Sequence, residues 1–204
     1  MNVDDNKKAL PETESGTGES ADIKPDGKRP DTYSELLMGC GSRINKDLFI
    51  GDKSEFNNLI RLDNNPDHDP DVIWDLTKHP LPFEDNSFDE IHAYEVLEHL
   101  AAQGDYEFFF AEFSEYWRIL KNGGVLLGTC PDKNSEWAWG DPSHKRIIQE
   151  ENFTFLDQES YQRQVGITRM SDFRSIYKAD FKLIFCEVRE KTLQFVLQAS
   201  KSGS

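Results

Sequence analysis

Two short segments carry residues that could bind a nucleotide-like small molecule. Gly39 and Gly41 flank Cys40 directly after an apolar run, and glycines at the end of a strand let the backbone approach a ligand closely. Asp63 follows about 20 residues later, where an acid typically holds ribose hydroxyls. This spacing predicts a ligand site at one edge of a sheet.

The glycine loop does not match the patterns that bind phosphate. A dinucleotide fingerprint, G-x-G-x-x-G, would need a third glycine where Ile44 stands, and the chain has no GxxxxGK[ST] motif. The stretch SRINKDLFIGDKSEFN that follows the loop contains Gly51 and has no clean helical periodicity. NAD, FAD and a phosphate-loop kinase are therefore disfavoured.

Further acids end the next apolar runs. Asp75 ends the third run and Glu95 follows the fourth. An acid at a strand end is often only a helix cap or a turn former. Acids at the ends of two runs, Asp63 and Asp75, together with a glycine loop favour a ligand site at the carboxyl ends of parallel strands.

These residues need a framework of strands and helices. Apolar runs predict five strands, at residues 35–38, 58–63, 71–76, 87–94 and 125–131. A helical pattern follows the fourth strand, is divided at Gly104 and ends at Gly123 and Gly124. A short helix is expected near 157–165, and strands at 180–188 and 191–200 form a hairpin with a turn at Arg189–Glu190.

This order of elements predicts an α/β fold. We expect a Rossmann-like, doubly wound and mostly parallel sheet that is closed by an antiparallel C-terminal hairpin. Residues 34–204 are expected to form a single domain. Residues 1–33 are rich in Pro, Gly, Ser and charge, and we expect them to form a flexible acidic tail.

Composition narrows the class of protein. The chain of 204 residues has 23 basic and 38 acidic side chains, and its formal charge of −15 disfavours general nucleic-acid or anionic-membrane binding. Its three cysteines are widely spaced, so a disulfide framework or a zinc cluster is not expected. We find neither an apolar run long enough for a membrane span nor a signal-peptide core, and we expect a cytoplasmic protein. The composition leaves a homodimer possible as the oligomeric state.

Four longer segments overlap the predicted strands: LLMGCGS, RLDNNP, DVIWDLTKHPLPFEDNSFDEIHAYEVLEHL and EYWRILKNGGVLLGTCP. They resemble the successive motifs of class I S-adenosylmethionine-dependent methyltransferases, most closely the small-molecule type with an LPF…SFD…LEH core. The resemblance implies S-adenosylmethionine as the cofactor. It also implies that the loop of Gly39, Cys40 and Gly41 contacts the methionine part.

The resemblance assigns further cofactor contacts one position at a time. Asp63, with Asn64 beside it, is implied to bind the ribose hydroxyls. Asp75 is implied to face the adenine amine with the Leu76 backbone beside it. Glu95 is implied to lie near the sulfonium and the amino acid part.

Two positions depart from the family pattern. Leu37 stands where the family usually has an acid, and Arg43 stands where a third glycine is common. These departures keep a second hypothesis open, in which the chain is a non-catalytic methyltransferase-fold protein that serves as a binding or interaction module.

Methyl transfer needs an aligned acceptor, and a hydroxyl acceptor would also need a base. His99 and His144 are the catalytic candidates, whereas His92 falls inside a strand and is expected to be a buried polar residue. For Trp137 and Trp139, packing of a loop is the default expectation. Lys145 and Arg146 could hold an acidic acceptor or form a surface pair.

The segment after the fourth predicted strand bears on the methyl acceptor and on a possible metal site. No [DNS]-P-P-[YFW] motif follows the fourth strand, so we expect a small-molecule, sugar or lipid-precursor acceptor rather than a nucleic-acid base. His92, Glu95 and His99 have helical spacing, but a strand and a helix would place them on different faces, so no metal is expected. The FFFAEF stretch (108–113) is expected to pack in the core.

Overall fold

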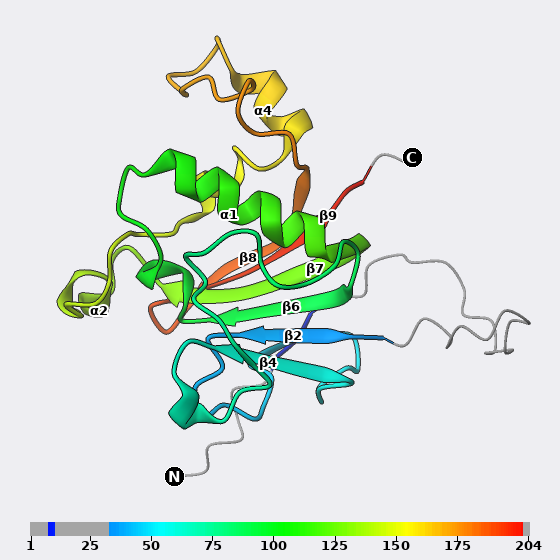
Figure 1. Cartoon of the computed structure of the whole chain (residues 1–204). Coiled ribbons are helices and arrows are strands. Elements are labelled where there is room, and N and C mark those ends of the chain that lie inside the picture. The colour runs from blue at the N-terminus through cyan, green and yellow to red at the C-terminus, as the bar shows by residue number, and fades with distance from the viewer. Residues whose placement is uncertain (1–7, 11–32, 202–204) are drawn as a thin grey trace, which may run out of the picture.

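The computed structural model describes residues 8–10 and 33–201 (Figure 1). Its strands are β1 (Lys8–Leu10), β2 (Glu35–Met38), β3 (Leu48–Ile50), β4 (Leu59–Asp63), β5 (Val72–Ile73), β6 (Phe88–Tyr94), β7 (Leu120–Pro131), β8 (Phe181–Arg189) and β9 (Thr192–Ala199). Its α-helices are α1 (Tyr106–Ile119), α2 (Glu136–Gly140), α3 (Glu150–Phe153) and α4 (Gln158–Gln164), and its 3-10 helices are η1 (Pro66–His68) and η2 (Leu97–His99). No helix of the described residues is long and apolar enough to cross a membrane.

Seven strands of the described part form one sheet in the order β5-β4-β2-β6-β7-β9-β8 (Figure 1). The pairs from β5 to β7 are parallel, and β9 runs antiparallel to both β7 and β8. The predicted α/β fold, with a mostly parallel sheet and a C-terminal hairpin, is confirmed. The carboxyl ends of β2, β4 and β6 meet at one edge, because parallel strands share a direction.

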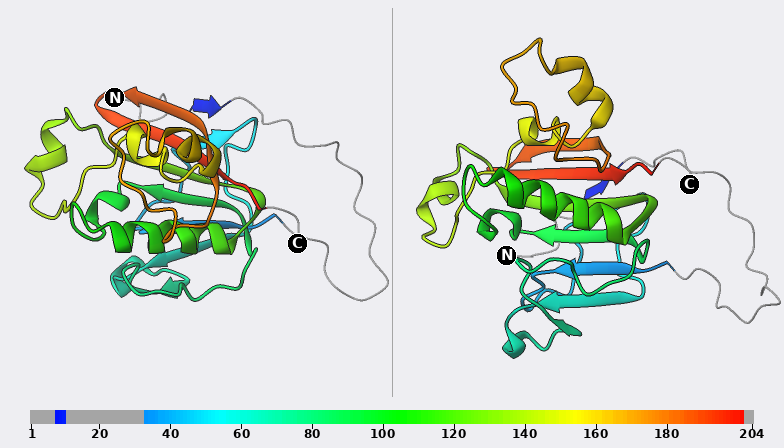
Figure 2. Two further views of the ribbon diagram at one scale, coloured as in Figure 1. Left: turned by 90° about the horizontal axis from the view of Figure 1, so that it is seen from above. Right: turned by 45° about the horizontal axis from the view of Figure 1, so that its top comes forward.

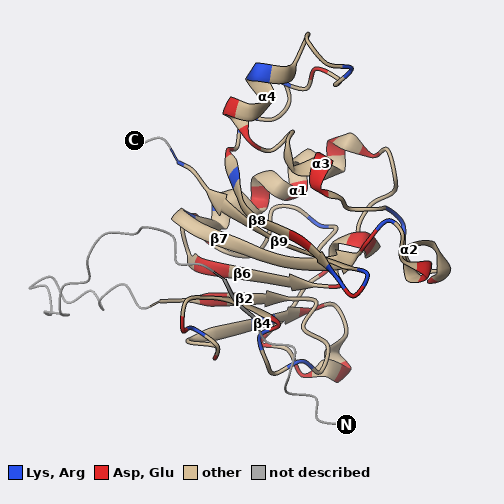
Figure 3. Cartoon of the chain, turned by 180° about the vertical axis from the view of Figure 1, so that it is seen from behind, with Lys and Arg blue, Asp and Glu red and all other residues tan. Residues whose placement is uncertain are grey.

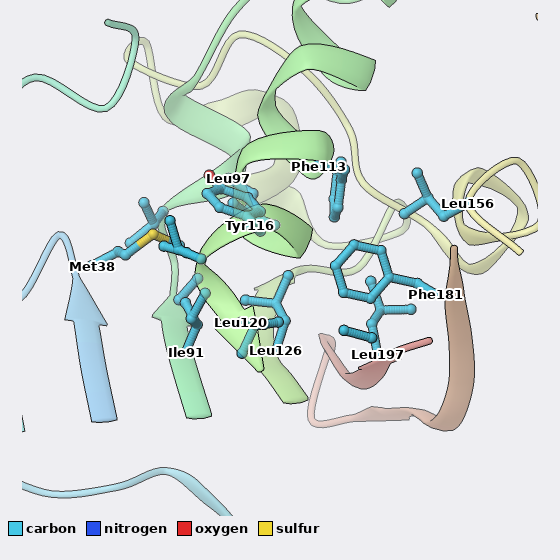
Figure 4. Close-up of a cluster of buried hydrophobic side chains, with 14 of the residues drawn as sticks. Met38, Ile91, Leu97, Phe113, Tyr116, Leu120, Leu126, Leu156, Phe181 and Leu197 are labelled. Carbon is cyan, nitrogen blue, oxygen red and sulfur yellow. The ribbon is translucent and has the colours of Figure 1, made fainter. Parts of the chain in front are cut away.

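Helix α1 covers one face of this sheet. The Asp105 side chain caps the helix by accepting a hydrogen bond from the Phe108 N–H at 3.1 Å. Phe113 and Tyr116 point from α1 toward the sheet, where they meet residues such as Ile91 and Leu126 (Figure 4). The expected core role of the 108–113 stretch is confirmed, since Phe110 and Phe113 are buried.

The opposite face has a second, smaller apolar cluster. Leu37, Tyr94 and Leu127 alternate with the residues that face α1, and Leu48 of β3 packs against them. β1 pairs with β3 in parallel and lies across the sheet from α1 (Figure 2). β1 falls inside the segment expected to be a flexible tail, and residues 1–7 and 11–32 of that segment lie outside the described ones.

Three predicted boundaries shift. Helix α1 ends at Ile119, and β7 begins at Leu120 and runs through Gly123 and Gly124, so the glycines do not end the helix. Pairing of Leu120 with Phe88 of β6 extends the strand backward, a long-range contact that local pattern does not reveal. β5 covers two residues instead of six. The hairpin turn is Glu190–Lys191, where both residues have positive φ.

A charged network is buried beneath β3. The Lys46 ammonium lies 2.8 Å from a carboxylate oxygen of Glu35 and 2.8 Å from one of Glu90. The His92 Nε2 lies 3.1 Å from the same Glu90 oxygen, and all four side chains are at most 1% exposed. His92 is thus a buried polar residue, as expected. This network joins β2, β6 and the loop after β2.

The Glu90 carboxyl should make stability depend on pH. Burial raises its pKa, but hydrogen bonds from His92, Lys46 and Tyr33 lower it more, to about 2. A depressed pKa contributes stability above the unfolded value near 4.5, which is lost as the pH falls toward 2. We expect the unfolding free energy to drop by about 2 kcal/mol between pH 6 and pH 3 through this group.

Urea unfolding at a series of pH values measures this effect. In Glu90→Gln, the unfolding free energy should fall less between pH 6 and pH 3, because the contribution of the Glu90 carboxyl is gone. An acid slope that is identical in Glu90→Gln and in the unsubstituted chain would contradict the assignment.

Candidate active site

A cavity of about 1020 Å³ opens at the carboxyl ends of β2, β6 and β7. Such an edge is where open α/β sheets bind ligands. Its walls come from the glycine loop, the ends of β6 and β7, and the β8–β9 hairpin. They are formed by Gly39, Cys40, Gly41, Ser42, Arg43, Ile44, Asn45, Lys46, Asp47, Tyr94, Glu95, Thr129, Arg189, Glu190, Thr192 and Gln194.

The glycine loop requires its first glycine. Gly39 and Gly41 have φ values of 55° and 50°, in the left-handed region that glycine populates readily. A Cβ on Gly39 would lie 2.7 Å from the Val96 Cγ2, whereas one on Gly41 would meet nothing within 4 Å. Cys40 between them is buried, and burial raises the pKa of its thiol. The loop therefore brings its backbone close to the cavity, and it does not present a reactive thiol.

Asp63 ties the loop to the end of β4. Its carboxylate accepts hydrogen bonds from the Gly41 N–H at 2.8 Å and the Asn65 N–H at 2.9 Å. Burial raises the pKa of Asp63, but these backbone bonds and a contact with His68 lower it more, so the group is ionised. Asp63 stands behind the loop and does not line the cavity. This contact between an acid and the glycine loop is one that the sequence did not predict.

The other predicted contacts from this side also lie away from the cavity. Asp75 accepts hydrogen bonds from the backbone and hydroxyl of Thr77 in a turn beyond β5. Leu76 is buried in the main core, and Asn64 is exposed. The cavity brings together Gly39, Cys40, Gly41 and Glu95. Asp63, Asn64, Asp75 and Leu76 are not part of its walls.

Glu95 occupies a strained position at the end of β6. Its φ is 56°, although it is not a glycine, and its N–H donates to the Thr129 carbonyl at 2.9 Å. Desolvation raises the pKa of Glu95, while the Thr129 side chain and the nearby His144 and Arg43 oppose that shift. Strained non-glycine residues cluster at functional sites. Glu95 thus presents a carboxylate to the cavity from a fixed backbone.

A second group of side chains follows Glu95 directly. The Glu98 carboxylate lies 4.0 Å from the His99 Nε2 and 3.9 Å from the His144 Nε2. The two imidazole centroids are 4.6 Å apart, so the structure brings both predicted catalytic histidines together. Burial raises the pKa of Glu98 to about 7 and lowers that of His99.

Backbone pairing brings the distant His144 to this place. The Glu98 carbonyl accepts the Lys145 N–H at 2.8 Å and the Arg146 N–H at 3.3 Å. Arg146 is buried, donates to the Leu97 carbonyl at 2.8 Å and pairs with the buried Glu112. Of the two alternatives for Lys145 and Arg146, the surface pair is therefore wrong for Arg146, which anchors the segment after α2.

The tryptophans differ from the packing expectation. Trp137 and Trp139 on α2 are 64% and 67% exposed, while Ala138 between them is buried. The Ser135 side chain caps this short helix. Two large aromatic faces therefore lie open to solvent.

Part of the cavity wall escaped the sequence analysis. Thr192 and Gln194 alternate on β9, Arg189 ends β8, and Glu190 lies in the turn between the two strands. Charges of both signs gather at this turn (Figure 3). Nothing local marks these residues, because only pairing of β9 with β7 brings them to the site.

Comparisons with known proteins decide the fold family. Residues 53–128 match the model of the methyltransferase domain family. A solved chain from the complex between the Haloferax volcanii Trm112 methyltransferase activator and the methyltransferase superposes with a TM-score of 0.52 at 14% identity, covering 83% of this chain and 84% of that one. The chain has a class I methyltransferase fold. The resemblance to class I methyltransferases is thereby confirmed at the level of the fold.

Two more solved structures share this methyltransferase fold. A SAM-dependent methyltransferase from Archaeoglobus fulgidus gives a TM-score of 0.51 at 16% identity over 82% of this chain and 86% of that one. The [4+2]-cyclase SpnF gives 0.50 at 14% identity over 84% and 76%. No curated protein matches the chain. At such identities the likeness establishes the fold and leaves the activity to be argued from the site.

Proposed function

We propose that the protein is an S-adenosylmethionine-dependent methyltransferase for a small-molecule acceptor such as a sugar or lipid precursor. The observation that carries this proposal is the left-handed glycine loop, tied by Asp63 and facing Glu95 across the cavity. The methyltransferase-domain match over residues 53–128 supports it.

The charges of the site fit a cationic cofactor. Arg43 and Lys46, the cations just beyond the glycine loop, are each paired with carboxylates: Arg43 with Asp47, and Lys46 with acids of the buried network. Glu95 adds a carboxylate at the cavity. A phosphate would find little free positive charge in this loop, whereas a sulfonium and an ammonium would find an acid.

Each residue group then has a task. Gly39, Cys40 and Gly41 would hold the methionine part, with Glu95 near the charged end. Asp63 with Asn64 would contact the ribose, and Asp75 with Leu76 the adenine, where the cofactor extends beyond the walls of this cavity. When bound, the cofactor supplies a methyl group activated by positive sulfur. The protein must align an acceptor with it, and orientation alone contributes on the order of 7–11 kcal/mol in favourable cases.

His99 and His144 belong to the acceptor side of this proposal. His99 follows Glu95 along the chain, and His144 lies against Glu98, which is between Glu95 and His99 in the sequence. The exposed faces of Trp137 and Trp139 lie on the helix before His144 and suit the apolar face of a sugar ring or a lipid. We propose that this group positions the acceptor.

Asp63→Ala should weaken cofactor binding at least tenfold, equivalent to about 1.4 kcal/mol. The substitution removes the acceptor that holds the Gly41 N–H, so the loop loses its fixed approach to the ligand. Equilibrium dialysis with labelled S-adenosylmethionine measures the change. Asp85→Ala is the matched control, because Asp85 is 68% exposed and pairs with Arg118 away from the cavity.

A transfer assay tests the activity itself. The purified chain is incubated with methyl-labelled S-adenosylmethionine and separate panels of sugars, lipid precursors and hydroxylated metabolites. Label that appears in one panel supports the enzyme. Cofactor binding without transfer to any panel favours a non-catalytic binding module, the second candidate, which Leu37 in the buried core and Arg43 beside Asp47 support.

A further inference from the structure

Glu98 is a buried acid that forms no ion pair with a lysine or an arginine among the described residues. Its side chain is 2% exposed, and neither carboxylate oxygen has a hydrogen-bond partner of normal geometry among the described residues. The Cys130 thiol, a weak donor, is the side chain closest to satisfying it. The nearby Arg146 pairs with Glu112 through Nη2, and its buried Nη1 has no hydrogen-bond partner among the described residues. Its charge lowers the pKa of Glu98 but does not offset the effect of burial. Burial favours the protonated form of this group, and a bound cation would stabilise its ionised form.

The two histidines supply the remaining donors. Ligand atoms of Glu98, His99 and His144 all lie within 4.8 Å of one another. The Nδ1 of His144 is also buried without a partner among the residues described. Imidazole nitrogens and a carboxylate oxygen are the usual ligands of divalent first-row transition metals.

A hydrogen-bond relay orients His99 for this purpose. The Ser143 hydroxyl donates to Asp141 at 2.6 Å, so it accepts a hydrogen bond from the His99 Nδ1–H at 3.2 Å. That arrangement leaves the unprotonated Nε2 of His99 on the side of Glu98. A hydrogen-bond acceptor behind the imidazole, here the Ser143 hydroxyl held by Asp141, is the usual outer support of a metal-binding histidine.

The other carboxylate–histidine group of the described residues serves as a contrast. Glu35, Glu90 and His92 also lie within 4.8 Å of one another, but the Lys46 ammonium sits 2.8 Å from both carboxylates. That group already holds its cation. The group at Glu98 has no such ammonium.

We propose that Glu98, His99 and His144 form a binding site for a divalent transition-metal ion, with Mn²⁺ or Co²⁺ as suitable probes. The two Glu98–histidine separations, 3.9 and 4.0 Å, exceed the roughly 3–3.5 Å expected between ligands with bonds of about 2.1 Å, so the side chains must move closer together to hold an ion. The His99 side chain is 36% exposed and offers the ion a path of entry.

An ion here would lie beside Glu95, which faces the cavity. If the chain methylates a hydroxyl, the ion can bind the acceptor oxygen and favour loss of its proton. That role rests on the proposed function, whereas binding of the ion does not. The proposed metal site differs from the ligand combination of His92, Glu95 and His99, at which no metal was expected from the sequence.

Calorimetry with CoCl₂ on chelator-treated protein, without S-adenosylmethionine, tests the site. We expect one Co²⁺ per chain, a visible absorption band of bound Co²⁺, and weaker binding of MgCl₂. Glu98→Gln and His144→Asn should each weaken Co²⁺ binding at least tenfold, and Ser143→Ala should weaken it by a smaller factor. Because Glu98→Gln is nearly isosteric, circular dichroism should show an intact fold.

His79→Gln is the matched control, since His79 stacks on Phe108 outside the cluster and should leave binding unchanged. If Glu98→Gln does not fold, the half-exposed His99→Asn decides the matter. Absence of a stoichiometric Co²⁺ site, or binding that survives in all the ligand variants, would overturn the proposal. Loss of the metal with retained S-adenosylmethionine binding would leave the proposed function standing.

Discussion

Lys46→Met is expected to lower the unfolding free energy by about 3–5 kcal/mol, the range found when one partner of a buried ion pair is removed. The ammonium of Lys46 lies between the carboxylates of Glu35 and Glu90, and all three side chains are at most 1% exposed. Without it, two buried like charges face each other with only His92 to compensate them. Urea unfolding followed by circular dichroism measures the loss.

Two further variants test whether the loss of stability comes from the buried charges. Lys121→Met removes a partly exposed pair with Asp89 of the same 2.8 Å length, and should change stability by no more than about 1 kcal/mol. Adding Glu35→Gln to Lys46→Met should recover part of the loss, because one buried charge is gone. Equal stability of Lys46→Met and the unsubstituted chain would show that the network is not a stabilising element.

Gly39→Ala is expected to destabilise the fold by about 2–4 kcal/mol and to weaken S-adenosylmethionine binding tenfold or more. The left-handed backbone costs about 1–2 kcal/mol for a residue with a Cβ. The overlap with Val96 adds about 1–2 kcal/mol, because that side chain is itself packed in the core. Unfolding and ligand titration of the same preparation give both numbers.

Gly41→Ala is the matched control for the overlap. It has nearly the same φ but open space around the added Cβ, so it should cost only the backbone contribution. Val96→Ala in the Gly39→Ala background removes the two methyl groups that would collide and should restore part of the stability. If Gly39→Ala and Gly41→Ala are equally stable, close packing of the loop on Val96 is not what requires the glycine.

The framework of the fold was predictable because it depends on local pattern. Apolar runs place β2, β4, β6 and the centre of β7, and two closing runs place the hairpin. The end of α1 was not predictable, since pairing of Leu120 with Phe88 overrides the glycine stop signal. β1 was also not predicted from the sequence. Its three residues and the three residues of β3 show no strong strand pattern by themselves, and only their pairing forms the small sheet.

The candidate site was predictable in part for the same reason. Gly39, Gly41 and Glu95 stand at strand ends, which the sequence marks. The cluster of Glu98, His99 and His144 depends on backbone pairing between η2 and the segment after α2, about 45 residues apart along the chain. The anchoring of that segment by Arg146 and Glu112 is buried chemistry that a charged sequence would ordinarily assign to the surface.

Isothermal titration of the purified chain with S-adenosylmethionine and with S-adenosylhomocysteine is the most direct measurement. We predict one site per chain with a dissociation constant in the micromolar range for both ligands, weakened in Asp63→Ala and unchanged in Asp85→Ala. ATP and NAD should give no heat at the same concentrations. No heat and no thermal stabilisation with either adenosyl ligand would contradict the proposed methyltransferase and leave the fold as a scaffold for other contacts.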